Sequence, residues 1–310
     1  MVQGNRIMNA NAHLFSLVLL TIATVAVGAD QGVSFGKTDS QIDVKIDGKS
    51  FAVYNTSTDL PKPFFSPVRG SDGTILTRPI ENPEDHKHHK GIWVSVDEVN
   101  GVTFWAETGK IQNIDTVAKK ASGDAPATLK TTNAWLGEDG KPIVTEDTTI
   151  SIFPNRLMVY DINFIAADKE VTFDDTKEGL LGFRMVNSMR EKESGKVVNA
   201  DGKKGTDECW GIPSAWVDYY GEVEGNVFGV TLMDHPGNLR PSRYHVRNYG
   251  LFSVSPFGEK AYTRGKSEAA PVVLKPNGKL RLRYAIYIHD GDTAEGKVAG
   301  AYKQFLGATK

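Results

Sequence analysis

Short runs of alternating apolar and polar residues, separated by turn residues, follow one another along most of the chain. Residues 41–55 (QIDVKIDGKSFAVYN) contain two such runs on either side of Asp47-Gly48, a dipeptide typical of tight hairpin turns. Similar pairs of runs surround Asn100-Gly101 and Pro154-Asn155. A period of two places successive side chains on opposite faces of a strand. The pattern therefore predicts many short antiparallel strands.

The C-terminal third continues this pattern and ends with a helical signal. Residues 251–258 read as one strand, and residues 271–291 as two strands that pair across Pro276-Asn277-Gly278. The segment from Asp292 to Leu306 begins with a typical helix cap and spaces its apolar residues at helical intervals. Residues 190–207 are charged and without periodicity, which predicts a long exposed loop. We expect an all-β, single-domain antiparallel β-sandwich with a short C-terminal helix.

The N-terminal residues predict a signal peptide. Arg6 precedes the apolar run Leu14–Val27, and Val27-Gly28-Ala29 fits a small-x-small cleavage site. The run has about 14 residues, fewer than the roughly 20 needed to span a bilayer, and no later stretch is as apolar. We expect residues 1–29 to be removed, and residues 30–310 to form one exported domain, periplasmic or extracellular, without a membrane span. A retained membrane anchor is the alternative.

Composition narrows the range of functions. The formal net charge of −2 gives no electrostatic reason to expect binding to nucleic acid. Cys209 is the sole cysteine, so an internal disulfide is excluded, and this thiol is expected to be packed rather than nucleophilic. The chain contains no GxSxG elbow, no HExxH helix and no glycine-rich phosphate loop. The candidate chemistry must therefore come from other side chains.

The densest candidate site is DHKHHKGIW (residues 85–93), which holds His86, His88 and His89, three of the seven histidines. Imidazole titrates near neutral pH and is the commonest metal ligand. In an extended segment, His86 and His88 would project from one face and His89 from the other. The alternative is a polar loop whose histidines only form hydrogen bonds. The segment alone leaves the two interpretations about equally supported.

A second group of candidates is suited to binding a polar ligand. Residues 234–258 combine arginine, histidine and aromatic side chains, and arginine presents a planar fork of donors to carboxylates and hydroxyls. The alternative here is a rigid loop pinned by arginine–backbone hydrogen bonds. Elsewhere, an arginine within an apolar strand requires a partner, and an aromatic face can stack on a sugar ring. The predicted binding residues are Arg69, Arg184, Trp210, His235, Asn238, Arg240, His245 and Arg247.

Three blocks of the sequence carry a resemblance to a known family. Residues 63–79 (PFFSPVRGSDGTILTRP), 85–107 and 234–258 resemble the signature blocks of the PmoA-like family, whose members carry the automatic name "methane oxygenase PmoA". That name implies a subunit of a membrane-bound monooxygenase. Such a subunit needs several apolar spans of about 20 residues, and the sequence contains none after the N-terminal run. The sequence therefore argues against methane oxygenase activity.

A more distant resemblance concerns the fold. Residues 271–289 are similar to the closing strand pair of galactose-mutarotase-like supersandwiches, and His89-Lys90-Gly91 resembles the His-Gly element of their sugar cleft. This resemblance implies a supersandwich fold in which His89 or His86 acts as an acid towards a sugar ring oxygen. The family also uses a late glutamate, for which Glu268 is the available residue.

Together these features predict an exported protein that binds or acts on a carbohydrate, with His86, His88 and His89 in acid–base roles. As an enzyme it would be isomerase- or epimerase-like, or lyase- or hydrolase-like, and this interpretation requires no cofactor. The first alternative is a metal-dependent oxidase or lyase, in which His86 and His88 bind a divalent metal together with His235 or His245. The second alternative is a non-catalytic module, either one that binds a small molecule or an oligosaccharide or a structural sandwich of an exported assembly.

Overall fold

Two large antiparallel sheets face each other across an apolar core in the computed structural model, which describes residues 1–4 and 31–309. The strand order of the nine-stranded sheet is β18 (Arg243–Val246), β19 (Leu251–Ser255), β14 (Leu181–Arg184), β5 (Ile92–Val94), β4 (Phe64–Val68), β3 (Lys49–Asn55), β2 (Gln41–Ile46), β1 (Gly32–Lys37) and β9 (Ala121–Ser122). The order of the eight-stranded sheet is β15 (Lys196–Asn199), β16 (Trp216–Val223), β17 (Asn226–Asp234), β21 (Lys279–Asp290), β12 (Leu157–Ala166), β11 (Pro142–Ile152), β10 (Ala127–Leu136) and β8 (Lys110–Lys119).

Smaller elements complete the sandwich. A four-stranded sheet contains β20 (Val272–Leu274), β13 (Val171–Phe173), β6 (Glu98–Val99) and β7 (Val102–Thr103). The helices are short: η1 (Asn187–Met189), α1 (Gly205–Cys209), α2 (Glu259–Tyr262) and α3 (Val298–Ala308). None of the helices within the described residues has the length and apolar character needed to cross a membrane. The predicted signal peptide, residues 1–29, falls almost wholly outside the described part of the chain.

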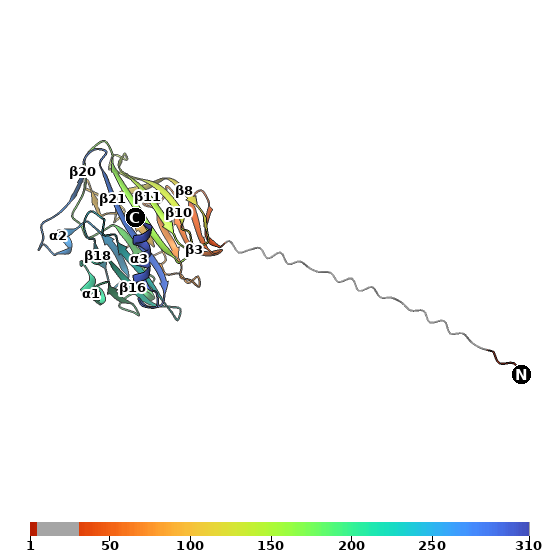
Figure 1. Cartoon of the computed structure of the whole chain (residues 1–310). Coiled ribbons are helices and arrows are strands. Elements are labelled where there is room, and N and C mark those ends of the chain that lie inside the picture. Colours follow the sequence, from red (N-terminus) through yellow and green to blue (C-terminus); the bar gives the residue numbers. More distant parts are fainter. Residues whose placement is uncertain (5–30, 310) are drawn as a thin grey trace.

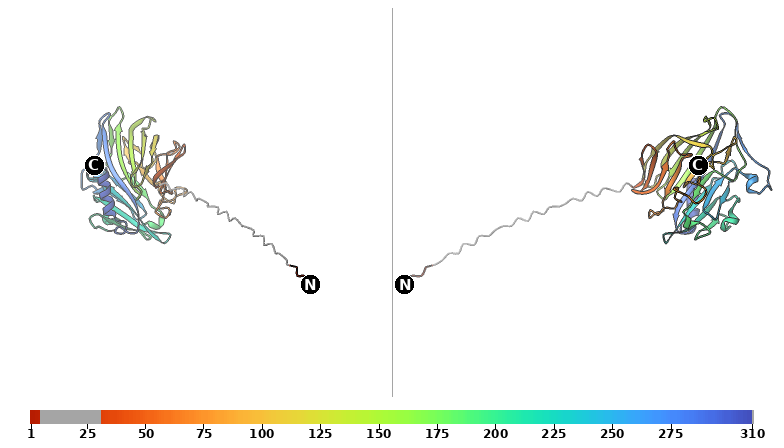
Figure 2. Two further views of the ribbon diagram at one scale, coloured as in Figure 1. Left: turned by 45° about the vertical axis from the view of Figure 1, so that its right-hand side comes forward. Right: turned by 180° about the vertical axis from the view of Figure 1, so that it is seen from behind.

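The strands show why the alternating pattern folds into two layers. Along β11, every second residue from Val144 to Ile152 is buried, while the intervening residues are only half-buried. The buried set meets aromatic side chains such as Trp135 and Phe173 in the core between the sheets. Figure 2 shows these layers from two further directions. The predicted all-β antiparallel sandwich is therefore confirmed.

Helix α3 covers the outer surface of the eight-stranded sheet (Figure 1). Its buried Val298, Ala301 and Phe305 pack against residues such as Leu157 and Met233. These are the apolar positions that the sequence predicts, and the C-terminal helix is confirmed. It begins later than expected, however, because the Asp292 side chain accepts hydrogen bonds from the amides of Ala294 and Glu295 and so caps the preceding turn.

Local turn chemistry predicts some connections well and others poorly. The hairpin at Asp47-Gly48 joins β2 to β3 as expected, with both turn residues at positive φ. The expected pairing across Pro276-Asn277-Gly278 is wrong, because β20 pairs with β13 while β21 pairs with β12 and β17. That turn thus carries the chain from one sheet to another. The predicted loop at 190–207 is also wrong, since it contains the edge strand β15 and the short helix α1.

Candidate functional site

The three clustered histidines lie on a tight turn rather than on an extended segment. The amide of His89 donates a hydrogen bond to the carbonyl of His86 over 2.9 Å, and His86 has a φ of 38°. The turn brings all three rings together: the ring centroids of His86 and His88 are 5.8 Å apart, and those of His88 and His89 are 4.5 Å apart. The segment is therefore not extended, and the expectation that His89 points away from His86 and His88 is wrong.

Aromatic rings stack from the buried Trp93 outwards through this turn. The Trp93 and His89 rings lie 5.4 Å apart, His89 and His86 4.7 Å apart, and His86 and Tyr249 5.0 Å apart. The interplanar angles along this series are 16°, 4° and 5°. Trp93 belongs to β5, whereas Tyr249 lies in the turn between β18 and β19. Stacking thus joins the two sequence blocks that the candidate residues come from.

A charged cluster fixes the backbone of the turn. Asp85 accepts hydrogen bonds from Arg184 Nη2 at 2.8 and 3.1 Å and also pairs with Arg78. Burial raises the pKa of Asp85, but the hydrogen bond and charge of Arg184 outweigh this and bring it to about 2. Arg78 in addition donates to the carbonyls of His86 and His89. The arginine predicted from the apolar strand thus has its partner carboxylate.

The same arginine determines the protonation of His89. Arg184 Nη1 lies 3.2 Å from His89 Nδ1, and a guanidinium can only donate hydrogen bonds. The Nδ1 atom is therefore the acceptor, and the neutral ring carries its hydrogen on Nε2. Burial lowers the pKa of His89, and the neighbouring charge of His88 and that of Arg184 lower it further. His89 is neutral and positioned, with its side chain buried against Trp93 and Trp105.

His88 differs from His89 because its ring forms no hydrogen bond within the described residues. Burial and the positive charge of Lys62 lower the pKa of His88 to about 4, so its imidazole is neutral at pH 7. Within the described residues, no side chain or backbone group forms a hydrogen bond with this ring. Lys62 itself is buried; its amine donates to the His88 carbonyl over 2.9 Å and pairs with Glu107 at 2.9 Å. A neutral, half-buried imidazole with a free nitrogen can accept a proton.

The β18–β19 hairpin lies beside the histidine turn, because its Tyr249 stacks on His86. His245, on β18, has its Nδ1 atom 3.2 Å from the Lys177 carbonyl and 3.5 Å from Glu178 Oε2. Burial lowers the pKa of His245 to about 4, against the opposing charge of Glu178. Arg247 is exposed, and its guanidinium lies 5.8 Å from the centroid of the Tyr249 ring. We call the group of His86, His88, His245, Arg247 and Tyr249 the histidine site.

A pocket of about 540 Å³ adjoins the histidine site at Arg247. Trp210, which follows α1, lines it, and the Trp210 ring centroid lies 6.2 Å from that of His245. The guanidinium of Arg264 lies over the Trp210 ring at 5.4 Å. The structure thus brings together seven predicted residues: His86, His88, His89, Arg184, Trp210, His245 and Arg247.

Two other predicted residues, Arg69 and Arg240, form hydrogen bonds with backbone carbonyls away from the histidine site. Arg69 donates to the Gly73 carbonyl over 3.0 Å, in a separate hollow at the β2–β3 turn. Arg240 donates to the Ala270 carbonyl, also over 3.0 Å. Both arginines thus pin loops to backbone carbonyls.

The remaining two predicted residues, His235 and Asn238, lie beside the eight-stranded sheet. The His235 ring packs on Phe305 of α3, with their centroids 5.5 Å apart. Asn238 bridges Asp234 and β21 through hydrogen bonds to Asp234 Oδ1 and to the backbone of Arg283. His235 is thus not brought to His86 and His88 as a third ligand. Within residues 1–4 and 31–309, no group of three or more histidine, cysteine, aspartate or glutamate side chains has the arrangement of a metal site.

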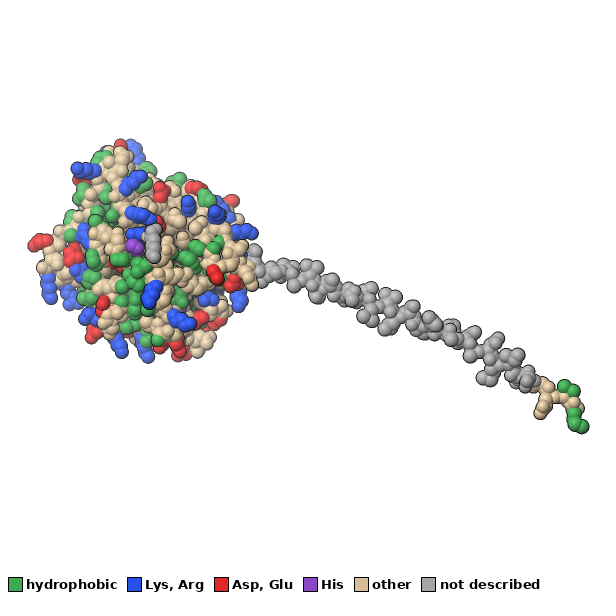
Figure 3. Space-filling model, viewed as in Figure 1, with side chains coloured by type: hydrophobic (Ala, Val, Ile, Leu, Met, Phe, Trp, Pro, Cys, Tyr) green, Lys and Arg blue, Asp and Glu red, His purple; other side chains and the backbone are tan. Residues whose placement is uncertain are grey.

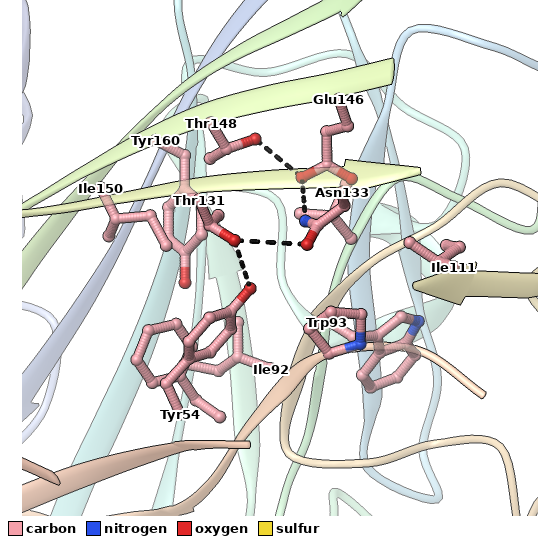
Figure 4. A pocket seen from close by; sticks show the side chains of 13 residues that line it. Tyr54, Ile92, Trp93, Ile111, Thr131, Asn133, Glu146, Thr148, Ile150 and Tyr160 are labelled. Atoms are coloured by element: carbon pink, nitrogen blue, oxygen red, sulfur yellow. Dashed lines mark hydrogen bonds between the residues drawn. The ribbon is translucent and has the colours of Figure 1, made fainter. Parts of the chain in front are cut away.

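A third, internal space lies between the sheets (Figure 4). The Glu146 carboxylate accepts hydrogen bonds from Asn133, Trp135 and Thr148 at 3.1, 3.0 and 2.7 Å. The cavity beside it has a volume of about 20 Å³, enough for roughly one water molecule. Its size excludes a sugar, so this space is separate from the candidate site.

Comparison with known proteins places the chain in a family. Residues 41–303 match the family of unknown function DUF6807. The chain belongs to this family. No curated protein matches the sequence.

Among solved structures, the DUF6807 protein is similar to galactose 1-epimerase from Lactobacillus acidophilus, with 10% identity and a TM-score of 0.43 over 84% of this chain and 99% of that chain. It is also similar to the GH36 α-galactosidase AgaA from Geobacillus stearothermophilus, with 8% identity and a TM-score of 0.42. The alignment covers 85% of the DUF6807 chain and 41% of the galactosidase, so the chain spans about two-fifths of that enzyme. A polysaccharide lyase matches at 12% identity and a TM-score of 0.32, over 88% of this chain and 34% of that chain.

Sequence reasoning missed several charged residues that lie beside the histidine site, among them Glu178 and Lys62. Glu178 lies next to His245, and its negative charge partly opposes the lowering of the His88 pKa by burial and by Lys62. Lys62 donates a hydrogen bond to the His88 carbonyl and so fixes the backbone of the histidine turn. Neither residue stands in a distinctive local pattern, and only the long-range contacts reveal their positions.

Proposed function

We propose that this protein binds a carbohydrate at the histidine site and acts on it by acid–base chemistry, with His88 as the general base. The observation that carries the proposal is the state of His88: neutral, half-buried and without a hydrogen-bond partner for its ring among the described residues. His89 and Arg184 act as positioning residues, because their polar atoms already face one another.

The surroundings of His88 favour a sugar as the ligand. Polar ring-shaped molecules are bound by aromatic faces together with hydrogen-bonding side chains. Tyr249 and Trp210 place aromatic rings beside the site, and Arg247, which lies over the Tyr249 ring and lines the pocket with Trp210, supplies donors. Ring opening of a sugar and elimination from a sugar both begin when a base removes a proton. We accordingly propose an isomerase-, epimerase- or lyase-like reaction. We also propose that the resemblance to the PmoA-like family reflects this site, because two of the three resembling blocks, residues 85–107 and 234–258, contain the residues of the histidine site.

The experiment compares His88→Gln with His235→Gln, whose ring lies on the other sheet. A panel of oligosaccharides is screened for binding, and ligands are then assayed by optical rotation and by the ultraviolet absorbance of unsaturated products. We expect His88→Gln to lower turnover by about 100-fold or more while binding persists, because general base catalysis contributes roughly that factor. Since the base must be neutral, wild-type activity should fall as the pH drops through about 4.

Two outcomes would overturn the proposal. One is that no carbohydrate of the panel binds to the wild-type protein. The other is that His88→Gln turns over substrate as fast as the wild type. The His235→Gln control separates these effects from a general loss of histidine, because the His235 ring packs on Phe305 of α3 and accepts a hydrogen bond from the amide of Gly237.

A further inference from the structure

The pocket beside Trp210 contains two arginines whose guanidinium groups have no acceptor within the described residues. Arg247 comes from the turn after β18, and Arg264 from the turn that follows α2. Other arginines of this region are paired: Arg243 binds Glu259 through two hydrogen bonds of 2.9 and 2.6 Å, and Arg184 binds Asp85. The donors of the two pocket arginines therefore remain available to a ligand.

Each of these guanidinium groups lies against an aromatic ring. Arg264 lies 5.4 Å from the centroid of Trp210, and Arg247 lies 5.8 Å from that of Tyr249. Cation–π contact restrains a guanidinium while leaving its N–H edge free to donate. The backbone also helps to place Arg264, which has a φ of 55° and sits in a turn closed by a hydrogen bond from Gly265 to the Lys260 carbonyl. The guanidinium groups of Arg247 and Arg264 are thus partly held in position before a ligand binds.

The charge of the pocket is positive. Its lining includes one carboxylate, Asp207, against the two guanidinium groups, and Asn248 adds a neutral amide. Arginine forks bind carboxylates through paired, charge-assisted hydrogen bonds. Arg247 lines this pocket and also lies over Tyr249, which stacks on His86, so the pocket lies next to the histidine site.

We propose that Arg247 and Arg264 bind the carboxylate of an acidic sugar, so that the ligand is an oligosaccharide containing hexuronate residues. This inference rests on the proposed function, because it names the substrate class for the same site. A neutral sugar leaves both guanidinium groups without an anionic partner. An acidic sugar provides that partner while its ring lies within reach of Trp210.

The test is titration calorimetry with trigalacturonate and with galactotriose, a neutral trisaccharide, extended to other uronate and neutral pairs. We expect the acidic ligand to bind the wild-type protein at least about tenfold more tightly, with an affinity that falls as salt rises. Arg264→Gln should remove most of that preference and leave neutral binding unchanged. Arg247→Gln should also remove the preference, and it should weaken neutral binding as well, because Arg247 belongs to the histidine site. Arg281→Gln is the matched control, because that arginine is exposed on the eight-stranded sheet and paired with Asp161.

The possible results separate the two proposals. If neutral sugars bind as tightly as acidic ones, or if both variants keep the full preference, the acidic-sugar inference is overturned and carbohydrate binding stands. If neither class binds, the proposed function fails, and the inference fails with it. Circular dichroism of each variant verifies that a loss of binding is not a loss of fold.

Discussion

Neighbouring histidines in this protein have different protonation behaviour because each meets a different partner. His89 faces the donor-only guanidinium of Arg184, which keeps Nδ1 unprotonated, whereas the ring of His88 has no partner among the described residues. His289, in β21, is the opposite case: its Nε2 lies 3.0 Å from Asp218 Oδ1, and its Nδ1 lies 3.2 Å from the Asp290 carbonyl. Both of its nitrogens face acceptors, which favours the imidazolium.

This arrangement predicts a pH-dependent stability. Burial lowers the pKa of His289, but the hydrogen bond and charge of Asp218 outweigh it, and the net pKa is raised. The stabilisation is therefore complete below the unfolded value of about 6.5 and is lost as the pH rises through the higher folded value. We expect the stability advantage of the wild type over His289→Gln, and over Asp218→Asn, to be largest below about pH 6.5 and to shrink as the pH rises above it, with urea denaturation as the measurement. The difference between wild type and variant isolates His289 from the histidines whose pKa values are lowered. A difference that does not change with pH in either variant would contradict this assignment.

At the residue scale, sequence reasoning singled out residues that lie near one another in the fold when those residues form unusual local clusters. The three histidines, Arg184 and His245 stood out locally, and the structure brings them together. It failed where a role depends on distance in the chain. Glu178 is next to His245 although 67 positions separate them, and no local spacing encodes that contact.

At the scale of elements, β10 and β11 place polar side chains inside the sandwich. Glu146 and Thr148 occupy inward positions of β11, and Asn133 faces them from β10. Burial raises the pKa of Glu146, while Thr148, Trp135 and Asn133 donate hydrogen bonds to its carboxylate. The network satisfies the carboxylate without a cation among the described residues.

Removing this carboxylate should be costly. In Glu146→Ala, three buried donors lose their acceptor, and we expect a loss of about 2–4 kcal/mol in the free energy of unfolding. Glu146→Gln keeps one carbonyl acceptor and should cost less. Urea denaturation measures both. A Glu146→Ala protein that unfolds at the wild-type urea concentration would show that the network adds no stability.

The same scale shows how far alternation predicts a fold. Period-two patterns located most strands, and the Asp47-Gly48 turn fixed one hairpin, because these signals are local. The partners of β20 and β21 lie far from them in the sequence: β13 and β12 are about 100 residues or more away, and β17 is 50 to 62 residues away. The turn between β20 and β21 could therefore not reveal the pairing. Strand β15 escaped notice because it is four residues long and follows a charged, glycine-containing stretch.

For the molecule as a whole, positive and negative side chains are interspersed over the surface shown in Figure 3. This distribution agrees with the small net charge of −2 and offers no extended basic surface on that side. The candidate sites therefore depend on local groups of charge, such as the arginines beside Trp210, rather than on a general attraction for polyanions.

We propose that the whole protein is exported after removal of residues 1–29. Expression of the full chain in a bacterium should yield an exported form whose intact mass corresponds to a start at Asp30. Ala29→Trp should block processing, because signal peptidase requires a small residue before the cut. A wild-type product that stays in the cytoplasm with Met1 or Val2 at its start would refute the proposal.

The fit of His289 also constrains how the family can change over evolutionary time. Its ring lies directly against Gly229 of β17 and Gly296, ahead of α3, and a Cβ at either glycine would overlap the imidazole. Two neighbouring strands and the chain leading to α3 therefore meet at one side chain. A lineage can acquire a larger residue at position 229 or 296 only after the histidine has been replaced by something smaller. The order of substitutions at these three positions is thus determined by steric contact, whatever ligand the protein binds.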